Sequence, residues 1–290
     1  MKVALFGQSY SPETAAALDT ALQTLKEFEA VVALEVGFAS LYHKSDKEFA
    51  FFSHRFGLDS SFDLFISFGG DGTVLRAITF VRNLGIPVVG VNTGRLGFLS
   101  TIGTDEVRNL IVNFARGEYR LVERCLVSVE LHPEQESGFM NFALNEVTVS
   151  RKDTTSMITV ETYLDGEYLT SYWADGLIVA TPTGSTGYSL SCGGPVVAPT
   201  AQSLVLTPIA PHNLNARPLV ISDTTVIKLK VSGRESQHLL SLDSRITSLE
   251  NGTEITITKA GFSVKMVEFP AESFFRTIRH KLLWGEDRRN

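Results

Sequence analysis

The stretch Phe65-Ile66-Ser67-Phe68-Gly69-Gly70-Asp71-Gly72-Thr73 decides how this chain is organised. Its apolar first half predicts a buried strand, and a helical pattern begins at Thr73. Glycine permits positive φ and close backbone approach, so the turn between them can aim its N–H groups at one point. Because that point lies at a helix N-terminus, it favours an anion such as phosphate.

Asp71 is the unusual residue of this turn, since a carboxylate repels the phosphate that the amides attract. It indicates a group that takes a proton or holds a cation, and the whole turn is typical of a phosphoryl-transfer site. The P-loop pattern is excluded because no lysine follows these glycines, and G-x-G-x-x-G is excluded because the third glycine is missing. The alternative is a tight strand-to-helix turn in which Asp71 only caps the helix.

The run Gly69-Gly70-Asp71-Gly72-Thr73 resembles the hallmark of the NAD kinase family, Gly-Gly-Asp-Gly-Thr after a strand. Diacylglycerol-type lipid kinases and phosphofructokinases share a similar Gly-Gly-Asp-Gly stretch. This motif alone therefore points to a superfamily, and the discrimination has to come from residues further along the chain.

The composition is typical of an ordinary globular protein: of the 290 residues, 43% are hydrophobic and 20% are charged. A net charge of −6 argues against general nucleic-acid binding. The two cysteines, Cys125 and Cys192, give neither a disulfide framework nor metal-ligand spacing. Because we find no signal-peptide pattern and no apolar run of membrane-spanning length, we expect a cytoplasmic protein without a membrane partner.

Residues 1–118 predict an α/β domain that carries the Gly-Gly-Asp-Gly-Thr loop, because strand and helix patterns alternate along them. We expect a doubly wound, mainly parallel sheet, and ligands bind such sheets at the carboxyl ends of the strands. Expected strands lie at 2–6, 31–36, 64–68 and 86–91, and expected helices begin at 11, 38, 73 and 104. The helix that begins at Phe38 is expected to continue to Phe56, and neither His43 nor His54 is assigned a role.

The loop Asn92-Thr93-Gly94-Arg95-Leu96-Gly97-Phe98-Leu99 follows the strand at 86–91. It leaves the same sheet edge as the Asp71 turn, so both loops can face one site. The stretch also resembles the Asn-x-Gly-x-Leu-Gly-Phe segment of the NAD kinase family. The alternative is a glycine-bent connection.

Residues 119–269 predict a mostly antiparallel β domain of two packed sheets or a related open architecture, rich in β-branched and aromatic residues. Asp165-Gly166 marks a hairpin turn. Expected strands lie at 122–131, 139–149, 157–164, 168–172, 177–180, 204–207, 226–231, 238–242, 254–258 and 262–269. Residues 270–290 contain an amphipathic helix at 271–283, which by the resemblance returns to the first domain.

A hydroxyl-rich stretch in the second domain discriminates between the families. Residues 175–191 read Asp-Gly-Leu-Ile-Val-Ala-Thr-Pro-Thr-Gly-Ser-Thr-Gly-Tyr-Ser-Leu-Ser. Hydroxyls and free N–H groups suit a polar ligand, and Tyr188 can stack on an aromatic base. The stretch closely resembles the NAD kinase pattern Asp-Gly-Leu-Ile-Val-x-Thr-Pro-Thr-Gly-Ser-Thr-x-Tyr-Ser, which lipid kinases and phosphofructokinases lack. The alternative is a hydroxyl-rich structural turn.

The resemblance implies site residues at matching positions, and it extends to 208–218 and to Ser241-Leu242-Asp243. Asn145 and Glu146, expected inside the strand at 139–149, would bind ribose hydroxyls, and Asp71 would be the general base or hydroxyl-orienting group. Donor phosphates would bind at Gly70, Gly72 and Thr73. The implied dinucleotide-binding residues are Asp71, Gly72, Arg76, Asn145, Glu146, Asp175, Thr183, Thr186, Gly187, Tyr188, Ser189, Leu190, Ser191 and Ala210.

Departures from the family pattern are modest: Gly187 stands where alanine is common, Cys192 replaces a usual alanine, and Ala210 replaces a frequent cysteine. Gly187 is expected to loosen the loop that carries Tyr188. Trp173 lies where the family varies. His212 is expected to be structural.

The sequence is thus identified as a member of the NAD kinase family, with ATP-dependent phosphorylation of NAD at the adenosine ribose 2′-hydroxyl to give NADP. The resemblance also implies a divalent metal, expected to be Mg²⁺ from its usual role with phosphates, and a homo-oligomer, dimer or tetramer, that shares active sites. Two alternatives stay open: a kinase for a lipid or sugar phosphate, and a catalytically silent dinucleotide sensor. The preference between NAD and NADH, the choice of ATP or polyphosphate, the metal ligands and feedback control are left open.

Overall fold

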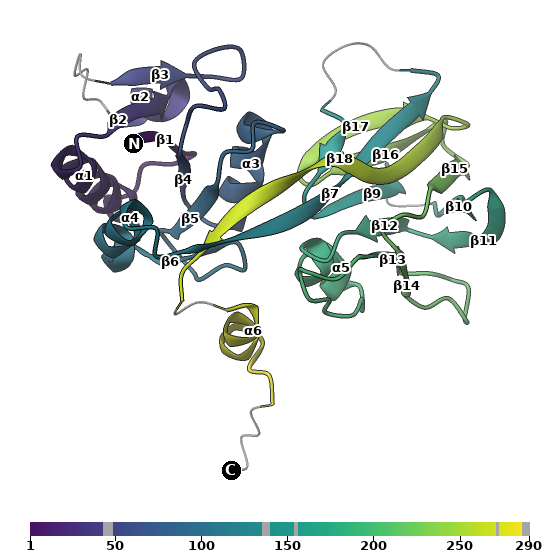
Figure 1. Cartoon of the computed structure of the whole chain (residues 1–290). Coiled ribbons are helices and arrows are strands. Elements are labelled where there is room, and N and C mark those ends of the chain that lie inside the picture. Colours follow the sequence, from purple (N-terminus) through teal and green to yellow (C-terminus); the bar gives the residue numbers. More distant parts are fainter. Residues whose placement is uncertain (43–48, 135–139, 154–155, 271–272, 286–290) are drawn as a thin grey trace. The chain divides into compact units, whose positions relative to one another are not determined.

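The computed structural model describes residues 1–42, 49–134, 140–153, 156–270 and 273–285. The chain forms two compact units, which are described separately below (Figure 1). Unit 1 comprises Met1–Glu123 and Val264–Asn290, and unit 2 comprises Arg124–Ser263. The change of unit falls inside two long strands, β7 (Arg120–His132) and β18 (Glu254–Glu268), a few residues from the boundaries expected at 118 and 269.

Unit 1 is a parallel sheet with strand order β5-β4-β1-β2-β3, and β6 pairs with the outer side of β5. The end of β18 also runs parallel to β5, with Met266 opposite Val88. This confirms the predicted α/β domain. Its strands are β1 (Lys2–Gly7), β2 (Val31–Glu35), β3 (Ala50–Phe52), β4 (Leu64–Phe68), β5 (Val88–Asn92) and β6 (Ser100–Gly103). Its helices are α1 (Pro12–Glu27), α2 (Val36–Tyr42), α3 (Asp71–Val81), the 3₁₀ turn η1 (Thr104–Glu106), α4 (Val107–Ala115) and α6 (Phe274–Leu282).

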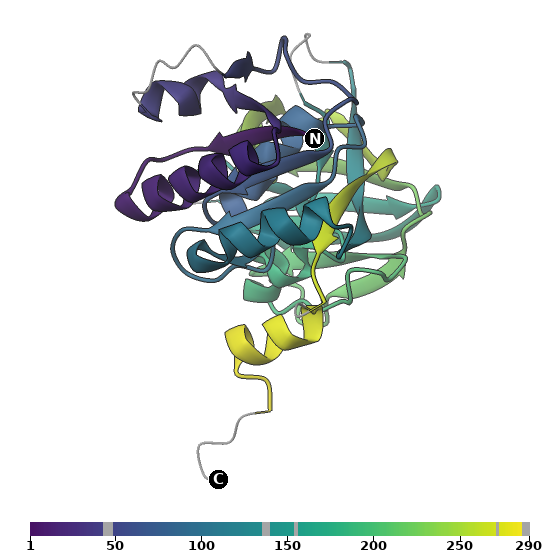
Figure 2. The same ribbon diagram turned by 60° about the vertical axis from the view of Figure 1, so that its left-hand side comes forward.

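Both faces of this sheet are covered. Neighbouring side chains of a strand point to opposite faces, so the residues of β4 pack alternately on one face and on the other. Leu64, Ile66 and Phe68 of β4 pack in one cluster with α1 and α4, which lie side by side (Figure 2). Phe65 points the other way and meets the Phe6 ring, which contacts Phe80 of α3 at 5.1 Å between centroids. Burial on both faces explains why β4 is apolar along its whole length.

The prediction of a helix from Phe38 to Phe56 is wrong. The described helix α2 ends at Tyr42, and β3 pairs in parallel with β2 through Ala50, Phe51 and Phe52. His43 lies outside the described residues. The apolar residues whose spacing suggested a helix include a strand, in which Phe52 is fully buried and Phe51 is 45% exposed. This alternation is typical of a strand at a sheet edge.

Unit 2 consists of antiparallel strands, as predicted, in two sheets around one core. One sheet has the order β14-β13-β12-β9-β16-β17, and the other contains β11-β10-β15-β18, with β7 pairing with β18 and β8. Inward residues of both sheets share a cluster that includes Val160, Leu229, Val149 and Leu240. The strands are β8 (Phe142–Ala143), β9 (Glu146–Arg151), β10 (Ile158–Leu164), β11 (Glu167–Ala174), β12 (Gly176–Ala180), β13 (Ser203–Ile209), β14 (Leu219–Ser222), β15 (Ile227–Gly233), β16 (Gln237–Leu242) and β17 (Arg245–Glu250).

Several strand boundaries differ from those expected. The strands expected at 254–258 and 262–269 are one strand, β18, and β14 and β17 were not predicted. The strand expected at 139–149 is divided into β8 and β9, so Asn145 lies in the connection rather than inside a strand. The predicted hairpin turn at Asp165-Gly166 is confirmed, with φ of 50° and 85°.

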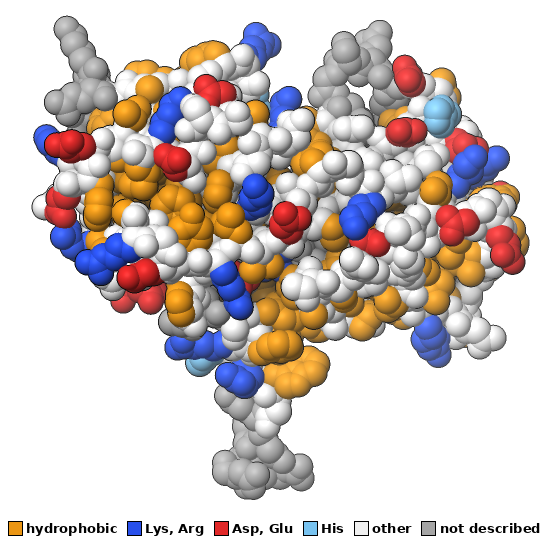
Figure 3. Space-filling model, in the orientation of Figure 1, with side chains coloured by type: hydrophobic (Ala, Val, Ile, Leu, Met, Phe, Trp, Pro, Cys, Tyr) orange, Lys and Arg blue, Asp and Glu red, His pale blue; other side chains and the backbone are white. Residues whose placement is uncertain are grey.

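The surface carries charges of both signs (Figure 3). The helix α6 differs from this mixed pattern, because its last turn is basic. It also exposes large apolar side chains: Phe275, within the helix, is 67% exposed, and Trp284, just beyond its end, is 60% exposed. In the part of the chain that the structure describes, no helix combines the length and the apolar character that crossing a membrane requires.

Candidate functional site

The turn that follows β4 in unit 1 is built so that its backbone is accessible. Gly69 has φ of +149°, and a Cβ there would lie 2.3 Å from the Thr73 hydroxyl, so only glycine fits. Gly70 and Gly72 are exposed, with open space where a Cβ would stand. The N–H groups of Asp71 and Gly72, at the start of α3, have no acceptor within a helix. This geometry suits an anion, as the sequence predicted.

Asp71 joins this turn to the loop 92–99. Its Oδ1 accepts hydrogen bonds from the N–H groups of Leu99 at 2.9 Å and Ser100 at 3.0 Å and from the Ser100 hydroxyl at 3.2 Å. Its Oδ2 accepts from the Phe98 N–H at 2.8 Å. A Cβ on Gly97 would lie 1.8 Å from Oδ1, so glycine is required there. The expectation that the two loops face one site is therefore confirmed within unit 1.

Asn92, which the sequence analysis gave no role of its own, shapes that loop. Its Nδ2 donates to the carbonyls of Arg95 at 2.5 Å and Ser100 at 3.2 Å, and its Oδ1 accepts from the Gly94 N–H at 2.7 Å. The side chain is 6% exposed. Asn92 therefore fixes the loop whose amides hold Asp71. The signal was its place at the first position after an apolar strand.

The side chains expected further along α3 lie on both sides of the helix. Thr73 is buried and Arg76 is exposed. Burial, with Arg76 and Arg82 nearby, lowers the pKa of His54. His54 stacks on Phe80 with 3.7 Å between ring centroids and makes a 3.0 Å hydrogen bond with Thr79, so its role is packing.

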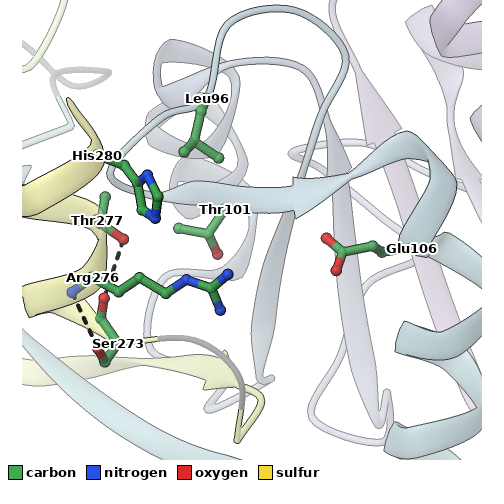
Figure 4. Close-up of a pocket in the computed structure, with 7 residues that line it drawn as sticks. All are labelled: Leu96, Thr101, Glu106, Ser273, Arg276, Thr277 and His280. Atoms are coloured by element: carbon green, nitrogen blue, oxygen red, sulfur yellow. Dashed lines mark hydrogen bonds between the residues drawn. The ribbon is translucent and has the colours of Figure 1, made fainter.

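A pocket of about 260 Å³ lies beside the same loop within unit 1 (Figure 4). Leu96 and Thr101 line one side, and Arg276 and His280 of α6 point into it from the other. Ser273 caps α6 by accepting from the Arg276 N–H at 3.2 Å. Lys281 lies 4.7 Å from the centre of the Phe98 ring. The terminal helix thus packs next to the loop that Asp71 holds.

In unit 2, Asn145 and Glu146 present acceptor atoms that the protein leaves unused. Glu146 is 9% exposed. Its Oε2 and the Oδ1 of Asn145 are buried, and neither has a hydrogen-bond partner among the described residues. Burial raises the pKa of Glu146 to about 8, the Asp243 carboxylate adds to the rise, and a backbone hydrogen bond from Tyr188 opposes it. Buried unused acceptors are costly and indicate a ligand that donates hydrogen bonds.

The hydroxyl-rich turn 181–187 lies directly against these two residues. The Thr181 N–H donates to the Asn145 carbonyl at 2.8 Å, and a Cβ on Gly184 would lie 2.1 Å from that carbonyl oxygen. A Cβ on Gly187 would lie 3.2 Å from Glu146 Oε2. The structure therefore brings together the two stretches of unit 2 that carry the family resemblance.

Not every hydroxyl of this turn faces outward. Ser185 is buried and donates to the Pro182 carbonyl at 2.7 Å, and Ser189 is buried and shares a 2.8 Å hydrogen bond with Thr207. The buried hydroxyl of Thr183 has no partner within the described ranges. Tyr188 is 45% exposed, as expected for a ring outside the core.

The other expected residues of unit 2 are spread over its strand ends. Asp175 makes a 3.0 Å ion pair with Arg151. Ala210 is exposed and has φ of +44°. Trp173 is 53% exposed, and its ring centroid lies 5.6 Å from that of the exposed His212, so a structural role for His212 stays a prediction. Thr186, Gly187 and Leu190 are half-buried, and Ser191 is exposed.

The described ranges contain no group of three or more His, Cys, Asp or Glu side chains placed to hold a metal ion. This does not conflict with Mg²⁺, which is usually held by one or two carboxylates together with substrate phosphates. Among the described residues, the Oδ2 of Asp71 accepts a hydrogen bond from the Phe98 N–H, and a carboxylate oxygen has two lone-pair sites. Asp71 and the accessible turn therefore fit a metal that arrives with the phosphates.

Comparison with known proteins gives consistent matches over the chain. The model of the ATP-NAD kinase N-terminal domain matches residues 19–119, and that of the ATP-NAD kinase C-terminal domain matches residues 144–269. The NAD kinases of Christiangramia forsetii and Flavobacterium psychrophilum are each 53% identical to this chain over 294 residues. Each of these matches covers 100% of this chain and 100% of the relative.

Two solved structures are similar in fold. The yeast NADH kinase complexed with NADH has a TM-score of 0.86 at 24% identity, covering 99% of this chain and 88% of that one. The NAD kinase from Archaeoglobus fulgidus in complex with ATP has a TM-score of 0.73 at 29% identity, covering 98% and 99%.

Proposed function

The chain belongs to the NAD kinase family, and from this premise we propose which side chains serve its reaction, the transfer of the γ-phosphoryl group of ATP to the adenosine ribose 2′-hydroxyl of NAD. The observation that carries the proposal is the pair of buried, unused acceptors in unit 2, Asn145 Oδ1 and Glu146 Oε2. Ribose hydroxyls are donors, so they satisfy both atoms and fix the sugar's orientation.

Asp71 is proposed to orient the acceptor hydroxyl. Four donors already bind its carboxylate and fix its position beside the turn. Phosphoryl transfer passes through a loose transition state, in which a nucleophile needs alignment more than early deprotonation. A hydrogen bond from the hydroxyl to Oδ2 supplies that alignment, and the same oxygen can receive the proton late in the reaction.

The donor phosphates are proposed to bind at Gly70, Gly72 and Thr73 at the start of α3, where Gly70 and Gly72 are exposed, whereas Thr73 is buried and its N–H donates to the Gly70 carbonyl at 2.9 Å. Helix dipole and N–H groups both favour an anion there. A divalent metal, with Mg²⁺ as the proposed ion, would neutralise charge on the phosphates when bound, and Asp71 is the residue that we propose to contact it. ATP as the donor follows from the family.

The dinucleotide is proposed to contact the hydroxyl-rich turn and the strand ends of unit 2. The Tyr188 ring, exposed at 45%, offers a face for a base. Since the Ser189 hydroxyl is bonded to Thr207, Ser189 is expected to contribute its backbone. The further proposed contacts are Arg76, Asp175, Thr183, Thr186, Gly187, Leu190, Ser191 and Ala210.

Product formation by the purified chain tests this proposal, with NAD and NADH as acceptors and ATP and polyphosphate as donors, with and without Mg²⁺. We expect NADP from NAD and ATP, and loss of turnover when the metal is chelated. Asp71→Asn should lose turnover, whereas Asp59→Asn, on the exposed surface of unit 1, should not. Equal activity of the two variants would contradict the role of Asp71. Light scattering tests the proposed homo-oligomer.

A further inference from the structure

Asp243 is a buried carboxylate of unit 2 that binds the backbone next to the two proposed ribose ligands. Its Oδ2 accepts from the Leu144 N–H at 3.0 Å, and its Oδ1 accepts from the Asn145 N–H at 2.8 Å and the Glu146 N–H at 3.3 Å. Its side chain is 6% exposed. One carboxylate thus holds three consecutive amides from about a hundred residues away in the sequence.

These contacts complete the hydrogen bonding of the segment Leu144-Asn145-Glu146. The Leu144 carbonyl accepts from the Thr181 hydroxyl at 2.6 Å, and the Asn145 carbonyl accepts from the Thr181 N–H at 2.8 Å. The Glu146 carbonyl accepts from the Asp243 N–H at 3.0 Å. Every backbone donor and acceptor of the segment is therefore used, although Leu144 and Asn145 lie between strands. The side-chain atoms Asn145 Oδ1 and Glu146 Oε2, in contrast, have no hydrogen-bond partner among the described residues. The ordered backbone therefore presents these two side-chain atoms to a ligand.

The position of Asp243 is itself fixed by its surroundings. It occupies the two-residue turn between β16 and β17, where Leu242 pairs with Arg245, and has φ of +53°. Aspartate tolerates this left-handed conformation better than most residues other than glycine. The Ser241 hydroxyl donates to the Asp243 carbonyl at 2.9 Å, and Arg245 lies 3.6 Å from Oδ2.

We propose that Asp243 is a positioning residue of the kinase, holding Asn145 and Glu146 in the one backbone geometry that aims both side chains at the dinucleotide's ribose. The inference rests on the proposed function of those two residues. Three amides donate to this one carboxylate, so an alternative conformation of the segment would leave at least one buried amide without its acceptor.

Asp243 also affects the charge on Glu146. The groups that face Glu146 are Asp243 on the β16–β17 turn, with Arg245 beside it, and Tyr188 at the start of the helix α5 (Tyr188–Ser191). Burial raises the pKa of Asp243 as well, while the amides of Asn145, Leu144 and Glu146 and the Arg245 guanidinium oppose that rise. Removing the charge of Asp243 should therefore lower the pKa of Glu146.

The test compares Asp243→Asn with Asp223→Asn. Asp223 is a matched control, because it is 3% exposed in the same unit and pairs with Lys259 at 2.5 Å rather than with the segment 144–146. For each variant the measurements are kcat, KM for NAD, KM for ATP and Tm. We expect Asp243→Asn to raise KM for NAD about tenfold and leave KM for ATP within about twofold, and Asp223→Asn to lower Tm alone.

Two further measurements separate positioning from general destabilisation. In a Glu146→Gln background, Asp243→Asn should raise KM for NAD by less than about threefold, because part of its effect passes through Glu146. If Asp243→Asn does not fold, Ser241→Ala removes the bond to the Asp243 carbonyl and should raise KM for NAD more mildly.

Equal effects of Asp243→Asn and Asp223→Asn on KM for NAD would overturn the inference. Full additivity with Glu146→Gln, or an unchanged KM for NAD in Ser241→Ala, would also overturn it. Failure of the wild-type chain to form NADP would instead refute the proposed function, so the two failures are distinguishable.

Discussion

Raising the pH from 6 to 9 should tighten NAD binding, because Glu146 must lose a proton before both carboxylate oxygens can accept hydrogen bonds. Burial, with the Asp243 charge, raises the pKa of Glu146 to about 8 in the free protein. At neutral pH the free protein therefore holds this carboxyl mostly protonated. Ribose hydroxyls donate more strongly to a carboxylate than to a neutral acid, so the bound state favours the ionised form.

The magnitude follows from that pKa. If NAD binds only the ionised form, the competent fraction is about one in a hundred at pH 6, about one in eleven at pH 7 and near one at pH 9. Affinity should then rise about tenfold between pH 7 and pH 9, and up to about a hundredfold from pH 6. These are upper limits, since the protonated form retains some affinity.

Calorimetry at several pH values measures the dissociation constant, and repeating it in buffers of different ionisation enthalpy counts the protons released, about 0.9 per NAD at pH 7. The Glu146→Gln variant is the control and should bind NAD with little pH dependence. Burial raises the pKa of the Tyr188 phenol above its ordinary value, which keeps it out of this range. A flat affinity in the wild type, or an unchanged slope in Glu146→Gln, would refute the reasoning.

Other substitutions test the remaining parts of the site. Asp71→Asn should lower kcat by about 10²–10⁴-fold in a folded protein with nearly unchanged NAD affinity, measured by steady-state kinetics and circular dichroism. Gly97→Ala should also lower kcat and reduce Tm, because a Cβ would lie 1.8 Å from Asp71 Oδ1; unchanged kinetics would show that the loop yields. Tyr188→Ala should weaken NAD binding about tenfold with Tm unchanged, while Tyr188→Phe keeps most of the affinity. The unfolding free energy should fall as pH rises from about 4.5 to 8, since folded Glu146 holds its proton across that window and the unfolded chain does not, and denaturant titrations of Glu146→Gln should lack that part of the slope.

Local sequence patterns predicted the helices, strands and turns for which the local secondary-structure propensity agrees with the tertiary structure. The buried strand before Gly69 and the Asp165-Gly166 hairpin depend on nearby residues alone, and so does α3, although it begins at Asp71, two residues before the predicted start at Thr73. The segment around Phe51 failed because pairing with β2 outweighed its helical spacing. Likewise β17 (Arg245–Glu250) has an exposed face at a sheet edge, which weakens its apolar pattern.

The candidate site residues were predicted from motifs, whereas the residues that hold them in position were not predicted. Asp71, Asn145, Glu146 and Tyr188 were identified through resemblance, and the structure adds their geometry. The contact of Asp243 with Asn145 joins residues 98 positions apart, and no local periodicity encodes it. Asn92 is similar, since its hydrogen bonds to Gly94, Arg95 and Ser100 are visible only when the loop after β5 is folded.

Two aspartates perform the same structural task in the two units, and their exposure separates their roles. Asp71 holds the consecutive amides of Phe98, Leu99 and Ser100, and Asp243 holds those of Leu144, Asn145 and Glu146. Asp71 is half-buried beside Gly72, where a Cβ would meet open space, so a substrate can still reach its carboxylate. The Asp243 side chain is 6% exposed, with Arg245 beside it, so we expect it to act through the segment that it holds. The same set of hydrogen bonds therefore supports the chemistry proposed for Asp71 and the positioning proposed for Asp243.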